Sequence, residues 1–222
     1  MSQLFEKPKH RIFFDIESGC LDEKKLLKQF EPTFEPDKRL KDADKILADL
    51  EDKKLKWIES AGLKAEMGQI LCIGYCYDKE PVQILHGGKD EKKALELFRD
   101  ILQVASLAMT TVCGFCMKQF DLPYFRRRCL IHGIDLPFYN HADRYNPFTL
   151  KLYDAFEDWQ SGNRQDSISL DRLSRAFGGR GKMPDATGKD FAKLWISDRK
   201  KALEYVTWDV EETRFVVEKM NP

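Results

Sequence analysis

Two acidic residues at the end of an apolar run are the first place where this sequence could do chemistry. The segment Arg11 to Gly19 reads RIFFDIESG, and its apolar residues predict a buried strand over about 11–17. Because side chains alternate between faces along a strand, Asp15 and Glu17 point the same way. Two carboxylates held so close repel each other unless a cation or a proton lies between them. The pattern predicts a divalent-metal site, or else a strand end that already lies in solvent.

A third carboxylate lies in the middle of the chain. Asp121 precedes Leu122 and Pro123, where a helix is expected to begin. An Asp at this place is a natural N-cap of a helix, because its side chain can accept hydrogen bonds from the first backbone N–H groups. Asp121 is therefore either an N-cap or a further acid of the same site.

A fourth carboxylate interrupts the apolar stripe of the C-terminal helix. The stripe comprises Ala202, Tyr205, Val206, Asp209, Thr213 and Val216. A lone carboxylate on a buried face is unfavourable, and Tyr205 lies one turn earlier on the same face as Asp209. Asp209 is therefore either a buried side chain with a hydrogen-bonding neighbour or a partner of Asp15 and Glu17.

The elements that must position these residues follow from the hydrophobic pattern. Strands are expected at about 11–17, 69–77, 82–86 and 110–115, and helices at about 44–62, 91–107, 122–133, 148–159, 169–177 and 198–220. The polar segment of about 21–64, broken by Pro32 and Pro36, reads as a helical insertion after the first strand, with Asp44 and Gly62 as helix caps. Strands early and helices late predict one α/β domain, spanning 1–222, with a mixed sheet flanked by helices.

Composition narrows the class of protein. Lys and Arg together number 37 and so do Asp and Glu, so the net charge is zero and a polyanion would have to be held by a local patch or by metal. The six Cys are scattered, which favours reduced thiols in a cytoplasmic protein over a disulfide framework. With neither a signal peptide nor a long apolar run, no membrane span is expected.

Taken together, the acidic motifs resemble those of the DEDD superfamily of 3′→5′ exonucleases, in the subclass with a Tyr in the third motif. The matching residues are Asp15 and Glu17 in FDIES, Asp121 in GFCMKQFDLP, and Tyr205 and Asp209 in YVTWD. The sequence is most similar to phage and bacterial stand-alone relatives of the proofreading exonuclease domain of family B DNA polymerases. The resemblance covers about 11–218 and implies a ribonuclease H-like fold.

The resemblance implies hydrolysis of phosphodiester bonds at the 3′ end of single-stranded nucleic acid, DNA ahead of RNA, with release of nucleoside 5′-monophosphates. Two divalent ions, Mg²⁺ or Mn²⁺, would assist, and hard ions suit a site of Asp and Glu oxygens. By this resemblance, Asp15 would bridge both ions, Glu17 and Asp209 would complete the ligand set of the first ion, and Asp121 would support the second ion. Tyr205 would orient the attacking water, unless it is only a core Tyr. The resemblance also suggests replication or repair proteins as partners in trans.

One residue departs from the family pattern. Cys116 stands where the second motif usually has Asn. In the family this Asn helps to hold the terminal nucleotide, so Cys116 is expected to weaken that contact. Cys113 and Cys116 also form a Cys-x-x-Cys pair, for which a redox or zinc role is the alternative. The sequence lacks a second ligand pair, which favours buried thiols at a strand end.

Several residues near the motifs are candidates for substrate contact. They are Ile16, Cys116, Phe120, Leu122, Arg180 and Lys182. Phe120 and Leu122 could wedge against the terminal base or simply pack in the core. Arg180 and Lys182 lie in a Gly-rich loop of about 178–188, which either approaches phosphate or is a charged surface loop.

Two other functions remain open on the sequence alone. One is an exoribonuclease of the oligoribonuclease or RNase D kind, because the motifs do not report on contacts to the 2′ position. The other is a catalytically weak nucleic-acid-binding module on the same fold, against which the intact acidic set and Tyr205 argue.

Overall fold

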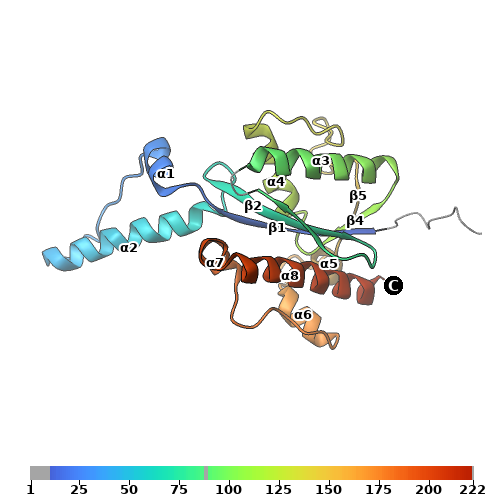
Figure 1. Cartoon of the computed structure of the whole chain (residues 1–222). Helices are drawn as coiled ribbons and strands as arrows, with labels where there is room; N and C mark the ends of the chain where they lie inside the picture. The colour runs from blue at the N-terminus through green and yellow to red at the C-terminus, as the bar shows by residue number, and fades with distance from the viewer. Residues whose placement is uncertain (1–10, 88–89, 222) are drawn as a thin grey trace, which may run out of the picture.

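A mixed β-sheet forms the centre of the molecule. The structure is a computed structural model and describes residues 11–87 and 90–221 (Figure 1). Within these residues five strands pair in the order β3-β2-β1-β4-β5. Their bounds are β1 Arg11–Cys20, β2 Gly68–Tyr77, β3 Gln83–His86, β4 Thr111–Gly114 and β5 Lys151–Asp154. The central strand β1 pairs antiparallel with β2 and parallel with β4, so the expected α/β fold with a mixed sheet is confirmed.

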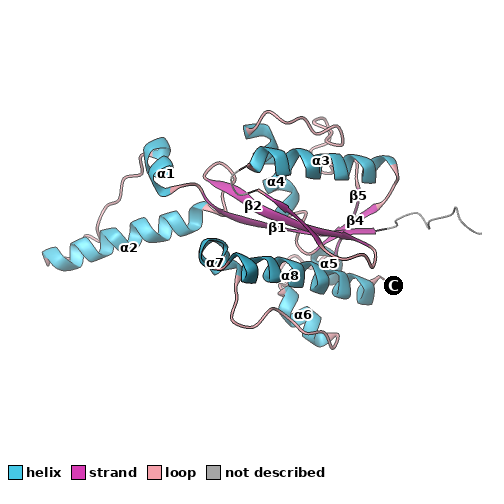
Figure 2. Ribbon diagram, viewed as in Figure 1, coloured by secondary structure: helices cyan, strands magenta, loops and turns pink. Residues whose placement is uncertain are grey.

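Helices cover both faces of this sheet. Their bounds are α1 Glu23–Phe30, α2 Ala43–Ala61, α3 Glu91–Leu107, α4 Asp121–Ile131, α5 Ala155–Gln160, α6 Leu170–Ala176, α7 Phe191–Ser197 and α8 Arg199–Met220. Figure 2 shows α3 and α4 on one side of the strands, and α8 with α5, α6 and α7 on the other. The sheet is thus a middle layer between two layers of helix.

The side chains of β1 divide between these two layers. Ile12, Phe14 and Ile16 are buried in the core that includes residues of α3 and α4. Phe13 packs in a second core with residues of α8. Asp15 lies two positions beyond Phe13, so it shares the face that α8 covers. The alternation continues to a register irregularity between Glu17 and Ser18.

A glycine allows α8 to approach the sheet closely. Gly74 on β2 pairs with Asp15 on β1. A Cβ atom at Gly74 would lie 2.5 Å from Val206 Cγ1 and 2.9 Å from Val210 Cγ2, closer than real carbon contacts. The missing side chain therefore sets the depth at which α8, and Asp209 with it, can sit over the central strand.

A buried ion pair ties the opposite layer together. Arg128 on α4 donates to both carboxylate oxygens of Glu91 on α3, at 2.8 and 2.6 Å, and to the Ala65 carbonyl at 2.7 Å. The Ile70 N–H at the start of β2 also donates to Glu91, at 2.7 Å. Burial would raise the pKa of Glu91, but these hydrogen bonds outweigh it and the pKa is lowered.

Three local predictions were wrong. The segment 148–159, which was expected to be one helix, contains strand β5 and becomes helical only at α5. Strand β5 forms because it pairs with β4, and a short apolar pattern does not reveal this pairing. Helix α7, between the Gly-rich loop and α8, was not expected. The N-cap of α2 is Asp42 rather than Asp44, since Asp42 accepts from the N–H groups of Asp44 and Lys45.

The helical insertion exists, and among the described residues its buried core lies at its base. Helices α1 and α2 form an arm that projects from the end of the sheet (Figure 1). A small core of Leu26, Ala61 and Met67 holds its base. Lys193 on α7 also forms an ion pair of 3.5 Å with Glu59 on α2.

Candidate active site

Three carboxylates from two distant parts of the chain meet between β1 and α8. Asp15, Glu17 and Asp209 each offer an oxygen atom, and these atoms all lie within 4.8 Å of one another. Glu17 and Asp209 are buried, at 8% and 5% exposure, and Asp15 is partly exposed. The strand alternation and the stripe on α8 thus bring together the residues that the sequence suggested.

Asp121 lies at the start of α4, outside this set of three. It is buried, and helix α4 begins at Asp121 itself, with Phe120 in the N-cap position. The expectation that Asp121 caps the helix is therefore wrong, because no side-chain capping bond forms there. Burial, followed by the charge of Asp15, raises the pKa of Asp121 well above its ordinary value. Asp121 therefore interacts electrostatically with Asp15, and its carboxylate also accepts a hydrogen bond from the backbone N–H of Ile16 on β1.

One cation from the Gly-rich loop approaches the acids. Lys182 Nζ lies 3.9 Å from Asp209 Oδ2 and donates to the Tyr205 hydroxyl at 3.5 Å. Tyr205 is also hydrogen-bonded to Asp209. Lys182, Tyr205 and Asp209 therefore form one polar group beside the carboxylates.

The acidic set carries more negative charge than Lys182 balances. Burial, followed by the charge of Asp209, raises the pKa of Asp15 from 3.8 to about 7. Burial and the charges of Asp15 and Asp209 raise the pKa of Glu17 well above 4.5. Lys182 lowers both, but not enough to cancel the shift. A bound cation would relieve this repulsion.

The residues present fit a divalent metal ion. The Asp209 Oδ1 atom is buried and has no hydrogen-bond partner among the described residues. A buried carboxylate oxygen without a partner is unfavourable in a folded protein, and coordination to a cation would satisfy it. The donor set consists of carboxylate oxygens, which suits Mg²⁺ or Mn²⁺ better than softer metals.

A tight turn connects β4 to Asp121. Asp154, at the end of β5, accepts hydrogen bonds from the N–H groups of Cys116 and Lys118, both at 2.9 Å. Cys116 has a φ of 63°, a left-handed conformation that Asn and Gly adopt more readily than Cys. Asp154 was not among the residues expected at the site, although an Asp directly before a helix is a capping signal, and Asp154 is indeed the N-cap of α5.

The remaining candidates for substrate contact differ in accessibility. Ile16 and Leu122 are buried in the main core, and Phe120 packs against Tyr124 with ring centroids 5.4 Å apart. Cys116 is half-buried, and its thiol lies 3.8 Å from Gln119 Oε1. Arg180 is half-exposed and is paired with Glu211 and Glu212.

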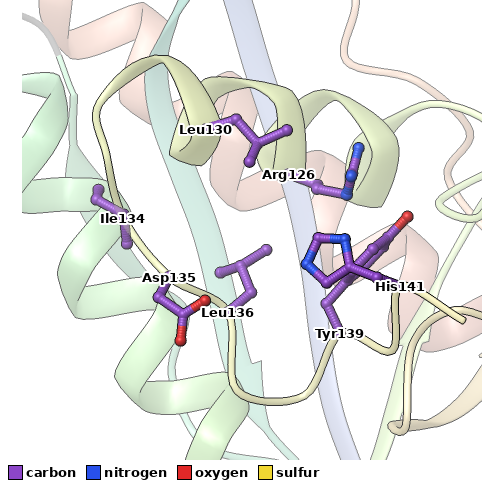
Figure 3. A pocket seen from close by; sticks show the side chains of 7 residues that line it. All are labelled: Arg126, Leu130, Ile134, Asp135, Leu136, Tyr139 and His141. Carbon is purple, nitrogen blue, oxygen red and sulfur yellow. The ribbon is translucent and has the colours of Figure 1, made fainter.

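A hollow beside α4 is too small to be a substrate pocket. Its volume is about 30 Å³, and Figure 3 shows Arg126 on α4 beside Tyr139 and His141 on the following loop. The Arg126 guanidinium lies 4.1 Å from the centre of the Tyr139 ring. This space suits at most a water molecule or two, so the contact serves to pack the loop on α4.

The sheet order and the clustered carboxylates define an α/β domain of the ribonuclease H-like kind. A sequence profile of the RNase H superfamily matches residues 58–221, and the chain belongs to this superfamily. A search of curated proteins finds no match. No helix of residues 11–87 or 90–221 is both long and apolar enough to cross a membrane.

One solved structure illustrates the similarity of fold. The family B DNA polymerase from the hyperthermophilic archaeon Pyrobaculum calidifontis matches with a TM-score of 0.61 and 17% sequence identity. The match covers 95% of this chain and 24% of the polymerase chain. At this identity the likeness concerns the fold, and the chain spans about a quarter of the length of that polymerase.

Proposed function

We propose that this protein is a metal-dependent 3′→5′ exonuclease of the DEDD superfamily, in the subclass with a Tyr in the third motif. The observation that carries the proposal is the convergence of Asp15, Glu17 and Asp209, with ligand atoms within 4.8 Å of one another. The substrate would be the 3′ end of a single-stranded nucleic acid, DNA ahead of RNA, and the product a nucleoside 5′-monophosphate. Family resemblance supplies the direction of digestion and the role of Asp121.

Each residue would have a distinct task. Asp15, Glu17 and Asp209 would hold one divalent ion, and Asp121 with Asp15 would hold a second. Such ions, when bound, supply an activated water and stabilise charge on the leaving 3′ oxygen. The Tyr205 hydroxyl, beside Asp209, would orient the attacking water. Lys182 would neutralise an oxygen of the scissile phosphate, because its ammonium group already lies at the edge of the acidic set.

The test is digestion of a 5′-labelled single-stranded DNA oligonucleotide and of its RNA twin, each with Mn²⁺, Mg²⁺ or chelator. Wild-type protein should give a metal-dependent ladder that shortens from the 3′ end. Asp15→Asn and Asp209→Asn should lower the rate by at least about a hundredfold, since each removes a charged ligand. Glu204→Gln is the matched control, because Glu204 is an exposed acid on the same helix as Asp209.

The comparison of the two strands separates the remaining alternatives. Faster digestion of RNA would identify an exoribonuclease. Binding of either strand without cleavage, in every metal tested, would contradict the exonuclease and favour a binding module. Cleavage that is unchanged in chelator or in Asp15→Asn would contradict the metal mechanism.

A further inference from the structure

The loop of residues 178–182 brings Lys182 to the acidic set, and two backbone contacts hold it there. Trp208 on α8 donates its indole N–H to the Gly181 carbonyl at 2.7 Å. The Lys182 N–H donates to Asp171 Oδ1 on α6, also at 2.7 Å. The backbone is thus bound to two helices at the point where the Lys182 side chain leaves it.

The buried acid Glu212 is hydrogen-bonded to Arg180 of the loop and, through Ser174, to Gly181. Glu212 on α8 is 3% exposed, and the hydroxyl of Ser174 donates to its Oε2. The Gly181 N–H donates in turn to Ser174 Oγ at 3.1 Å. Arg180 Nε donates to Glu212 Oε1 at 2.8 Å. A chain of hydrogen bonds therefore links α8, α6 and the loop.

The loop fits this place only because it contains glycine. Gly181 has a φ of 72°, and an added Cβ there would lie 2.4 Å from Asp171 Oδ1. Both the backbone conformation and the close approach exclude a side chain. The position of the loop is therefore tightly specified, and its residue Lys182 approaches Asp209.

Arg180 can be explained in two ways that make different predictions. Its side chain is 49% exposed beside an open groove of about 430 Å³, so it could touch a nucleic acid strand directly. Its guanidinium is nevertheless held by Glu211 and Glu212, and lies 4.0 Å from the centre of the Trp208 ring. A planar group with these partners is suited to fixing the loop.

We propose that Asp171, Ser174, Arg180, Gly181 and Glu212 form a positioning latch for Lys182. The latch holds loop 178–182 against α6 and α8, so that the Lys182 ammonium group stays beside Asp209 and Tyr205. The latch adds to the proposed function and rests on it in one respect: Lys182 is taken to act on the metal and phosphate groups of the same site.

The experiment measures Mn²⁺ affinity by calorimetric titration without nucleic acid. Lys182 is a cation 3.9 Å from Asp209, so Lys182→Met should tighten Mn²⁺ binding by about tenfold. Gly181→Ala and Arg180→Lys change no charge, but they loosen the latch. Like Lys182→Met, each of these two variants should tighten Mn²⁺ binding, by about threefold or more. Combined with Lys182→Met, neither should tighten Mn²⁺ binding any further.

Two matched controls separate the latch from general strain or loss of an Arg contact. Gly133→Ala places a side chain at a similar φ of 66°, with no atom within 4 Å of the added Cβ. Arg172→Lys changes an exposed Arg on α6. Both should leave Mn²⁺ affinity unchanged. Thermal unfolding confirms that each variant is folded at the temperature of the titration, and Arg180→Lys, at the surface, remains usable if Gly181→Ala does not fold.

The outcomes distinguish the latch from the exonuclease. Unchanged Mn²⁺ affinity in Arg180→Lys, or an effect that adds to that of Lys182→Met, would overturn the latch. If Arg180→Lys raised only the KM for the strand and left Mn²⁺ affinity alone, Arg180 would be a strand contact instead. Non-additive Mn²⁺ affinities in a protein that cleaves nothing would support the latch and reject the exonuclease. Failure of the wild type to bind Mn²⁺ would reject both.

Discussion

The carboxyl of Asp15 illustrates how a single residue links the fold to its proposed ligand. Its pKa is raised from 3.8 to about 7, first by burial and then by the charge of Asp209. Because the folded-state pKa lies above the unfolded value, this group favours the folded state at acid pH. That contribution is lost as the pH rises through about 7.

We therefore predict that metal-free protein loses stability between about pH 5 and pH 8, and that Mn²⁺ restores more stability at the higher pH. The reason is that the carboxylates must ionise against one another before they can bind the ion. Thermal unfolding in chelator and in Mn²⁺ at both pH values measures this. Asp15→Asn should reduce the effect of Mn²⁺, and an equal rise in Tm at both pH values would contradict the prediction.

The left-handed backbone conformation at Cys116 limits which side chains this position accepts without strain. We predict that Cys116→Val lowers the free energy of unfolding by about 1–2 kcal/mol, because a β-branched side chain is strained at a φ of 63°. Cys116→Asn should be at least as stable as wild type, since Asn tolerates this conformation. Urea unfolding measures both, and equal stability of the two variants would show that φ is not the constraint.

At the scale of the elements, the position of α8 over the sheet is decisive for the acidic set. We predict that Gly74→Ala lowers the free energy of unfolding by about 1–3 kcal/mol and weakens Mn²⁺ binding, because the new methyl displaces α8 and Asp209. Denaturant unfolding and Mn²⁺ titration measure the two effects.

A second substitution tests this explanation of Gly74. Val206 Cγ1 is the nearest atom to a Cβ at that position, so Val206→Ala makes room for it. The combined variant should be more stable than the sum of the single effects predicts. Strict additivity would show that the two side chains do not compete for the same space.

At the scale of the whole molecule, the arm of α1 and α2 stands apart from the sheet and its helices (Figure 1). Its buried residues, Leu26 and Ala61, lie near the base, and α2 has no buried residue before Ala61. We predict that the amides of the first half of α2 exchange with deuterium at least about tenfold faster than those of α8, because few packed contacts oppose their opening. Exchange followed by mass spectrometry checks this, and equal protection of the two helices would contradict it.

Much of the site follows from local periods in the sequence. The two-residue period of a strand put Asp15 and Glu17 on one face, and the four-residue spacing of a helix put Tyr205 beside Asp209. Both periods hold in the structure, because they depend on backbone geometry and on burial of the apolar residues around them. The α/β class followed from the order of the same patterns.

Other features were decided only by tertiary structure. The strand β5 forms because β4 lies beside it, and Asp154 then fixes the turn before Asp121. Lys182 lies 3.9 Å from Asp209, in a loop that is hydrogen-bonded to both α6 and α8. Such contacts join residues far apart in the chain, and no local period encodes them. The sequence by itself determined which residues carry the charge and the faces they share, while packing determined the distances between them, on which the electrostatics of the site depend.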